Sequence, residues 1–216
     1  MRIRTAVLAA LAALFTPVTA AHAAPGDDVR MPVRDALTAL DVTDESREGY
    51  SRDKFKHWTD ADRDGCSTRN EVLLNEAVAD PDRAGRCTLT GGTWYSPYDD
   101  RYVEGPRTLD IDHYVPLAES WDSGASTWTA KKRKAYANDL DEERSLIAVT
   151  AASNRSKADK DPAQWMPPAA GYRCEYATTW VIIKTRWRLS VDPAEAAALT
   201  RILGECPNVP VTVERA

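Results

Sequence analysis

Histidine is scarce in this chain of 216 residues, which contains only His22, His57 and His113. His22 falls in a segment that we expect to be removed, and the two remaining imidazoles are too few for the ligand set of a zinc metalloprotease. The four cysteines form no Cys-x-x-C pair, which argues against a zinc–thiolate site. The formal net charge is −5 and no long basic stripe occurs, so general steering toward a polyanion is not expected.

A long apolar run occurs only near the N-terminus. It spans residues 6–15, follows Arg2 and Arg4, and precedes the small residues around His22. A basic, an apolar and a small-residue segment in this order are typical of a secretory signal peptide. We therefore expect residues 1–24 to be cleaved and the mature protein to be secreted and extracellular. No later segment is apolar enough to serve as a membrane anchor.

The cysteine count predicts two disulfides, because the number is even and the compartment is oxidising. Three pairings are possible among Cys66, Cys87, Cys174 and Cys206. The clustering favours Cys66 with Cys87 and Cys174 with Cys206, since each pair then closes a loop of only about 20 to 30 residues.

Apolar periodicity and turn residues predict a mainly helical α+β domain. Helices are expected at 33–40, 51–58, 68–78, 127–138, 176–187 and 192–203. Asp192, Pro193 and Glu195 mark the start of the last helix, and Thr68-x-x-Glu71 fits a capping box. Strands are expected at 109–115 and 145–150, and a short hairpin at 87–90 and 93–95 with its turn at Gly91-Gly92.

His113 lies in the part of the sequence that carries the most chemistry. It ends the first expected strand, in Leu109-Asp110-Ile111-Asp112-His113-Tyr114-Val115-Pro116-Leu117. About forty residues later comes Ala152-Ser153-Asn154-Arg155-Ser156-Lys157-Ala158-Asp159-Lys160. The second expected strand lies between these two segments.

This ordered set resembles the HNH endonucleases, whose ββα-metal unit is a strand with Asp-His, a return strand, and a helix with an Asn or His ligand. It looks most like secreted bacterial HNH proteins with an Asp-His-x-x-Pro-Leu-Ala-Glu segment, an Asn-Arg-Ser-Lys-x-Asp-Lys-Asp-Pro segment and a tryptophan-rich C-terminal helix. The similarity covers residues 55–206 and implies a ββα-metal core built on a small antiparallel hairpin. We expect a signal peptide at 1–24, a mobile leader and first helix at 25–50, the nuclease domain at 51–207 and a tail at 208–216.

The resemblance implies a role for each residue of the two segments. His113, with an ordinary pKa of about 6.5, would be the general base that activates water. Asp112 and Asn154 would bind one divalent ion, Mg²⁺ or Mn²⁺, although Asp112 points to the opposite side of the strand from His113. Ser145 stands where the family has its middle Asn, and the role of orienting His113 stays open between Ser145 and Asn138.

Basic residues near the motif are candidates for holding phosphates. They are Lys157, Lys160 and Arg155, the last in a bidentate manner. The family also has a Cys-x-Thr-Arg-x-Glu segment, so Arg69 or Glu71 would line the active site. The expected partner is nucleic acid, DNA before RNA, bound without sequence preference by a monomer. Lys131 to Lys134 form a basic helix that would flank a DNA groove.

A second metal motif lies upstream of the nuclease motif. Asp60, Asp62 and Asp64, then Gly65, and Glu71 at the twelfth position reproduce the calcium loop of an EF-hand. The competing interpretation is a polar turn in which Glu71 caps the helix at Thr68. A structural Ca²⁺ would make the alternative function a calcium-stabilised secreted binding module without catalysis.

Overall fold

The computed structural model describes residues 28–216, so the predicted signal peptide at 1–24 lies outside the described residues. The helices are α1 (Val33–Thr38), α2 (Thr68–Asn75), α3 (Leu117–Asp122), α4 (Ala130–Tyr136), α5 (Ala151–Lys157), α6 (Arg173–Trp187) and α7 (Pro193–Gly204). The strands are β1 (Asp28–Pro32), β2 (Ala77–Ala79), β3 (Asp82–Ala84), β4 (Thr88–Thr90), β5 (Thr93–Ser96), β6 (Arg101–Glu104), β7 (Leu109–His113), β8 (Leu146–Thr150) and β9 (Pro210–Glu214). The fold is thus a mixture of α-helices and small antiparallel sheets, with more strand than the expected mainly helical domain.

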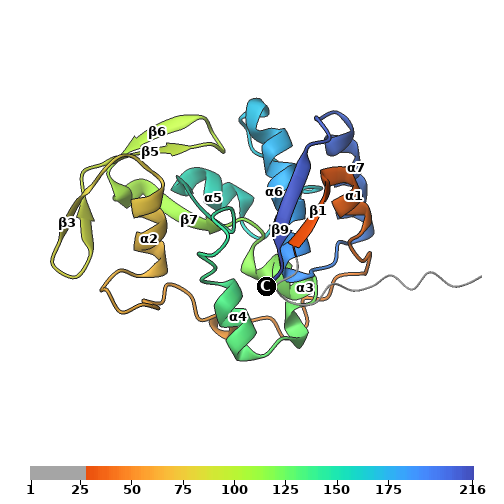
Figure 1. Cartoon of the computed structure of the whole chain (residues 1–216), viewed down its shortest axis with the longest axis horizontal. Helices are drawn as coiled ribbons and strands as arrows, with labels where there is room; N and C mark the ends of the chain where they lie inside the picture. The colour runs from red at the N-terminus through yellow and green to blue at the C-terminus, as the bar shows by residue number, and fades with distance from the viewer. Residues whose placement is uncertain (1–27) are drawn as a thin grey trace, which may run out of the picture.

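The hairpin β7–β8 separates two hydrophobic cores. Its register runs from Leu109↔Thr150 to His113↔Leu146. Leu109 and Ile111 face a small core, and Val149, on the other face, joins a large core built around α6. Figure 1 shows α1, α6 and α7 gathered on one side of the molecule, and α2, β3, β5 and β6 on the other. The predicted strands are confirmed, and the pleat directs consecutive residues of β7 into different cores.

The large core depends on the aromatic face of α6. Tyr176, Trp180, Ile183 and Trp187 are at most 4% exposed, as their helical spacing predicts. Lys184 on the same helix is completely buried, and its ammonium group contacts Glu119 of α3 at 2.8 Å and Glu195 of α7 at 2.7 Å. A buried ammonium needs such partners, so this ion pair fixes α3, the helix that follows His113, against α6.

The small core closes over α2. It contains Val72 and Leu73 of α2 and Trp94 of β5, packed on Leu109 and Ile111. Trp94 is completely buried and donates its indole N–H to the Leu73 carbonyl oxygen. This bond holds β5 in a sheet with β2 and β6.

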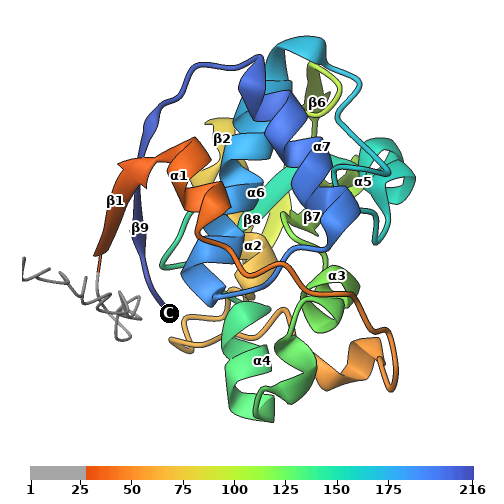
Figure 2. The same cartoon turned by 90° about the vertical axis from the view of Figure 1, so that its right-hand side faces the viewer.

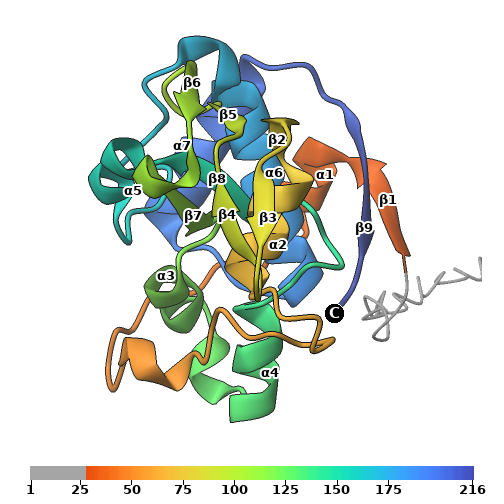
Figure 3. The same cartoon turned by 90° about the vertical axis from the view of Figure 1, so that its left-hand side faces the viewer.

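The predicted hairpin with its turn at Gly91-Gly92 is wrong, because β4 and β5 do not pair with each other. β4 pairs with β3, from Asp82↔Thr90 to Ala84↔Thr88, as Figure 3 shows. β5 instead pairs with β2 and β6. The two glycines therefore join two different sheets, because the burial of Trp94 outweighs a local turn.

The start of α2 also differs from the prediction. Its N-cap is Ser67, which makes no side-chain capping bond, and the helix ends at Asn75. Thr68 Oγ1 donates to the carbonyl oxygen of Thr59 and to Asn138 Oδ1, so no capping box forms. The expected helix at 51–58 is reduced to the short 3-10 turn η1 (Arg52–Lys54).

Both ends of the described chain are paired. β1 lies antiparallel to β9, from Asp28↔Glu214 to Pro32↔Pro210 (Figure 2). Val29 and Val213 are buried in the large core. Residues 28–32 of the expected leader and residues 210–214 of the expected tail thus form the two strands of one sheet.

Two local predictions are confirmed. The disulfides are Cys66–Cys87 and Cys174–Cys206, and they close the two short loops that the clustering favoured. Asp192 caps α7 by accepting from the backbone of Ala194 and Glu195, and Glu195 completes the capping box. The Cys174–Cys206 disulfide and the α7 cap belong to the C-terminal half of the domain, whereas Cys66–Cys87 joins the start of α2 to the segment before β4.

Glu76 provides a pH-dependent contact at the edge of the hairpin. It accepts a hydrogen bond from the Ala148 backbone N–H at 2.8 Å, and burial raises the pKa of its carboxyl group from 4.5 to about 7. Between these pH values the folded protein keeps a proton that the unfolded chain releases, so stability should fall as pH rises through this window. We expect Glu76→Gln to remove about 2 to 3 kcal/mol of that pH dependence. Urea unfolding at pH 5 and pH 8 measures the free energy of unfolding at both values. If this free energy changes between the two pH values as much in the variant as in wild type, the prediction is contradicted.

Candidate active site at the end of β7

A cavity of about 340 Å³ lies between the end of β7 and the C-terminal part of α5. Asp112, His113 and Asn154 all line it, so three predicted site residues meet in one space. Its other polar lining residues are Arg52, Arg155 and Asp159. Arg52 comes from a loop far away in the sequence, and no motif signalled it.

His113 is held by one backbone hydrogen bond and a ring of aromatic side chains. It is 5% exposed, and its Nε2 lies 3.0 Å from the Ala137 carbonyl oxygen. A carbonyl oxygen only accepts, so Nε2 carries the proton and Nδ1 keeps a free lone pair. The rings of Trp58 and Tyr136 lie 5.3 Å and 6.5 Å from the His113 ring. Burial lowers the pKa of His113 to about 3, so the ring is neutral at physiological pH.

Asp112 lies on the opposite face of β7 from His113, as expected, and is engaged in the interior. Its Oδ2 accepts from Tyr98 Oη at 2.8 Å and from Lys157 Nζ at 2.5 Å. Burial raises the pKa of Asp112 and lowers the pKa of Lys157, and the attraction between the two charges opposes both effects. The predicted metal ligand is therefore already part of a buried ion pair.

Lys157, which the sequence predicts to contact phosphate, lies in the interior of this structure. The side chain is completely buried, and its ammonium also donates to the carbonyl oxygens of His113 and Tyr114 at 3.0 and 2.9 Å. All three ammonium donors are thus used. Lys157 instead holds the end of β7, and with it His113, against α5.

Asn154 faces a carboxylate that the motif did not include. Its Nδ2 donates to Asp110 Oδ2 at 3.2 Å, which leaves the amide oxygen for another partner. Arg155 Nε lies 3.8 Å from the same Asp110 oxygen. Asp110 shares a strand face with Asp112 by the period of two, and this spacing was the signal that could have identified it.

Within the described residues, neither candidate for the middle residue of the signature forms a side-chain hydrogen bond with His113. Ser145 Oγ donates to Asp139 at 2.8 Å, and Asp139 is also paired with Arg186. Asn138 donates to the Lys56 carbonyl oxygen and accepts from the Thr59 N–H, so it anchors the loop that carries Trp58. The His113 ring is oriented instead by the Ala137 carbonyl, which any residue at position 137 would supply.

The remaining predicted substrate contacts are spread around the domain. Arg69 donates to the carbonyl oxygens of Pro106 and Leu109, at the far end of β7 from His113. Glu71 lies beside the acidic loop 60–64 and, like Arg69, does not line the cavity. Lys160 is exposed and donates to the Ser156 carbonyl oxygen. Only Arg155 stays at the cavity.

The donors at the cavity suit a hard divalent ion. Asp112 and Asn154 offer carboxylate and amide oxygen, and Mg²⁺ typically takes one or two protein carboxylates and completes its shell with water and phosphate oxygens. Lys157 shares the Asp112 carboxylate, which weakens its attraction for a cation. Among residues 28–216, the clusters of three or more acidic, His or Cys ligands lie elsewhere.

Fold and site together define a disulfide-bonded α+β domain with a polar cavity at the end of the β7–β8 hairpin. The chain belongs to the family described as "GmrSD restriction endonucleases, C-terminal domain", whose model matches residues 67–202. It is also 39% identical, over 93% of this chain and 97% of the relative, to an "Uncharacterized secreted protein" of Arthroderma benhamiae. That relative is fungal, so the expected resemblance to bacterial proteins in particular is not confirmed. No solved structure matches the chain.

The comparison also bears on location. The relative carries the description "secreted", in agreement with the expected signal peptide and the two disulfides. The protein is therefore secreted. Within the described residues, no helix has both the length and the apolar character needed to cross a membrane.

Proposed function

We propose that this protein is a secreted endonuclease of the HNH type, which hydrolyses phosphodiester bonds of DNA with the help of one divalent ion. The observation that carries the proposal is the neutral His113 imidazole, with Nδ1 unprotonated, in the same cavity as Asp112 and Asn154. The order β7, β8, α5, with His113 on the first strand and Asn154 on the helix, supports a ββα-metal core.

Each side chain has a defined task in this mechanism. His113 takes the proton of the attacking water, since it is neutral and its other nitrogen is fixed by Ala137. Asp112 and Asn154 would hold the Mg²⁺ or Mn²⁺, which supplies an acidified water and offsets phosphate charge when bound. Arg52 and Arg155 bring positive charge to the cavity and position the phosphate backbone. Lys157 keeps the His113 backbone in place.

The charge distribution favours weak, non-specific binding of the nucleic acid. The basic helix α4 ends beside the site, because Ala137 follows it and contacts His113. Part of its charge serves packing: Arg133 donates to the Trp128 carbonyl oxygen, and Lys132 lies 4.6 Å above the Trp128 ring. Because the loss of affinity with salt scales with the number of phosphates contacted, binding through few contacts should be weak and should fall only moderately as salt rises.

A plasmid-nicking assay tests the proposal. The mature protein, freed of metal by EDTA, should convert supercoiled plasmid to open circles after addition of Mg²⁺ or Mn²⁺ and should be inactive with EDTA. Single-stranded DNA and RNA in parallel reactions define the substrate. Protein that cuts none of these substrates with any divalent ion would overturn the assignment.

The second candidate function is a calcium-stabilised binding module without catalysis. It is favoured by the convergence of Asp60, Asp62 and Asp64 in the acidic loop. Stabilisation by calcium together with complete absence of nucleic-acid cleavage would support this candidate over the nuclease.

A further inference from the structure

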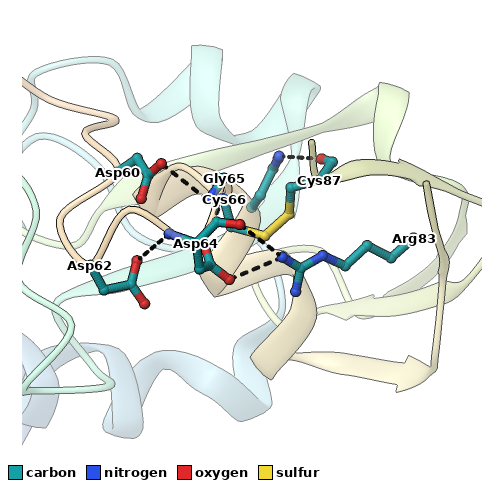
Figure 4. The surroundings of a disulfide bond; sticks show 8 residues. Asp60, Asp62, Asp64, Gly65, Cys66, Arg83 and Cys87 are labelled. Atoms are coloured by element: carbon teal, nitrogen blue, oxygen red, sulfur yellow. Dashed lines mark hydrogen bonds and ion pairs between the residues drawn. A yellow bond between two sulfur atoms is a disulfide. The ribbon is translucent and has the colours of Figure 1, made fainter. Parts of the chain in front are cut away.

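The loop before α2 brings together the acidic side chains of the twelve-residue motif. Carboxylate oxygens of Asp60, Asp62 and Asp64 lie within 4.8 Å of one another. Figure 4 shows the three side chains around the turn that leads to the Cys66–Cys87 disulfide. Like charges at this distance repel, and among these three only Asp64 forms an ion pair, with Arg83 at 3.0 Å.

Backbone N–H groups of the loop donate to one oxygen of each of the three aspartates. Gly65, at the sixth position, has φ +100° and donates its N–H to Asp60 Oδ2 at 3.1 Å. The N–H of Asp64 donates to Asp62 Oδ1, and that of Cys66 to Asp64 Oδ1. A glycine is required at such a φ. Each aspartate thus uses one oxygen to shape the turn. Within the described residues Asp60 and Asp62 keep their second oxygen available, whereas that of Asp64 is paired with Arg83.

Glu71, at the twelfth position, supplies independent evidence for a missing partner. Its Oε1 atom is sealed from solvent and has no hydrogen-bond partner within the described chain. A Glu71 carboxylate oxygen lies within 4.8 Å of an Asp64 carboxylate oxygen. Burial raises the pKa of Glu71, and the charges of Asp64 and Asp62 raise it further. A buried carboxylate oxygen without a donor is costly, and Glu71 is not used for capping, because α2 has no side-chain cap.

We propose that residues 60–71 form a calcium site, with ligands from Asp60, Asp62, Asp64 and Glu71 and from the Cys66 backbone carbonyl. These occupy positions 1, 3, 5, 12 and 7 of the calcium loop. Ca²⁺ binds oxygen at about 2.3 to 2.6 Å, so one ion can contact carboxylate oxygens that lie within 4.8 Å of one another. The ion replaces the repulsion among four carboxylates by attraction and gives Glu71 Oε1 its partner.

The site is connected by hydrogen bonds to His113. Thr59 precedes the loop and donates its N–H to Asn138 Oδ1, which also accepts from Thr68 at the start of α2. Asn138 follows Ala137, whose carbonyl orients the His113 ring. Calcium therefore fixes the two segments that hold Asn138, and its role is structural and separate from the proposed catalytic ion.

Calorimetry on metal-free protein tests this inference. Wild-type protein should bind one Ca²⁺ with a dissociation constant on the order of 10⁻⁴ M or tighter, the range of extracellular and sensor loops. At calcium one hundred times that constant, Tm should rise by about 5 to 10 °C. Asp62→Asn and Glu71→Gln should each weaken calcium binding at least tenfold and lose the shift.

Two further variants place the site. Asp82→Asn changes an exposed aspartate of the neighbouring strand β3 and should bind calcium like wild type. Asn154→Ala removes a proposed ligand of the catalytic ion and should also keep calcium binding, so the two metal proposals fail separately. Neutralising one of four close carboxylates relieves repulsion, so the loop variants should fold, which near-UV circular dichroism checks. Wild type that binds no calcium at millimolar concentration, or unchanged affinity in both loop variants, would overturn the site.

Discussion

His113→Ala should reduce plasmid cleavage about 10²- to 10⁴-fold, the range that a general base contributes. The variant removes the only imidazole that lines the cavity and leaves Asp112 and Asn154 in place. The rate constant for loss of supercoiled plasmid at saturating Mg²⁺ or Mn²⁺ is the quantity to measure. Because the change leaves the proposed metal ligands intact, the dissociation constant for the metal should change little.

His57→Ala is the matched control for this prediction. His57 is the other histidine of the described residues, and its Nδ1 bonds to the Phe55 carbonyl oxygen at 2.8 Å. It does not line the cavity, so this variant should cut at nearly the wild-type rate. Loss of a buried ring also lowers stability, and both variants are therefore compared well below their Tm. Cleavage by His113→Ala at the wild-type rate would remove the proposed mechanism.

Local signals in the sequence predicted the elements that hold the site. The β-branched run at 146–150 and the alternation at 109–113 identified the hairpin, and Asp192 with Glu195 identified the start of α7. The disulfides followed from short loop lengths. In each case the determining contacts lie within the segment or within a short loop.

Long-range packing determined what the sequence did not predict. β1 pairs with a strand at the opposite end of the chain, and β5 leaves its predicted partner because Trp94 is buried on α2. At the site, the two-residue period of a β-strand placed Asp112 and His113 on opposite faces of β7. It did not show which of these faces α5 covers. That packing puts Lys157 in the interior and Asn154 beside Asp110. Lys157 therefore pairs with Asp112 in the interior, a contact that neither its residue type nor its place in the motif indicates.

Lys157→Met should lower the free energy of unfolding by about 3 to 5 kcal/mol, the usual cost of leaving one charge of a buried pair alone. Asp112 then keeps only the Tyr98 hydroxyl as a donor, and the carbonyls of His113 and Tyr114 lose the ammonium. For a domain of this size the loss corresponds to a fall in Tm of about 6 to 20 °C. Urea unfolding at pH 7 measures it directly.

A double-mutant cycle shows whether the charge pair, and not the volume of the lysine, causes the loss. Asp112→Asn keeps an oxygen for the Tyr98 hydroxyl and removes the negative charge, so Lys157→Met in that background should cost about 1 to 3 kcal/mol less than in wild type. Equal costs in both backgrounds would show that the charge pair with Asp112 does not cause the loss, and that packing and the hydrogen bonds to the His113 and Tyr114 carbonyls account for it. Because Lys157 also binds the His113 carbonyl, the single variant should cut DNA more slowly even at temperatures where it stays folded, with the larger change in kcat. A rate that depends on stability alone would return to the wild-type value at low temperature, which separates positioning of the base from simple unfolding.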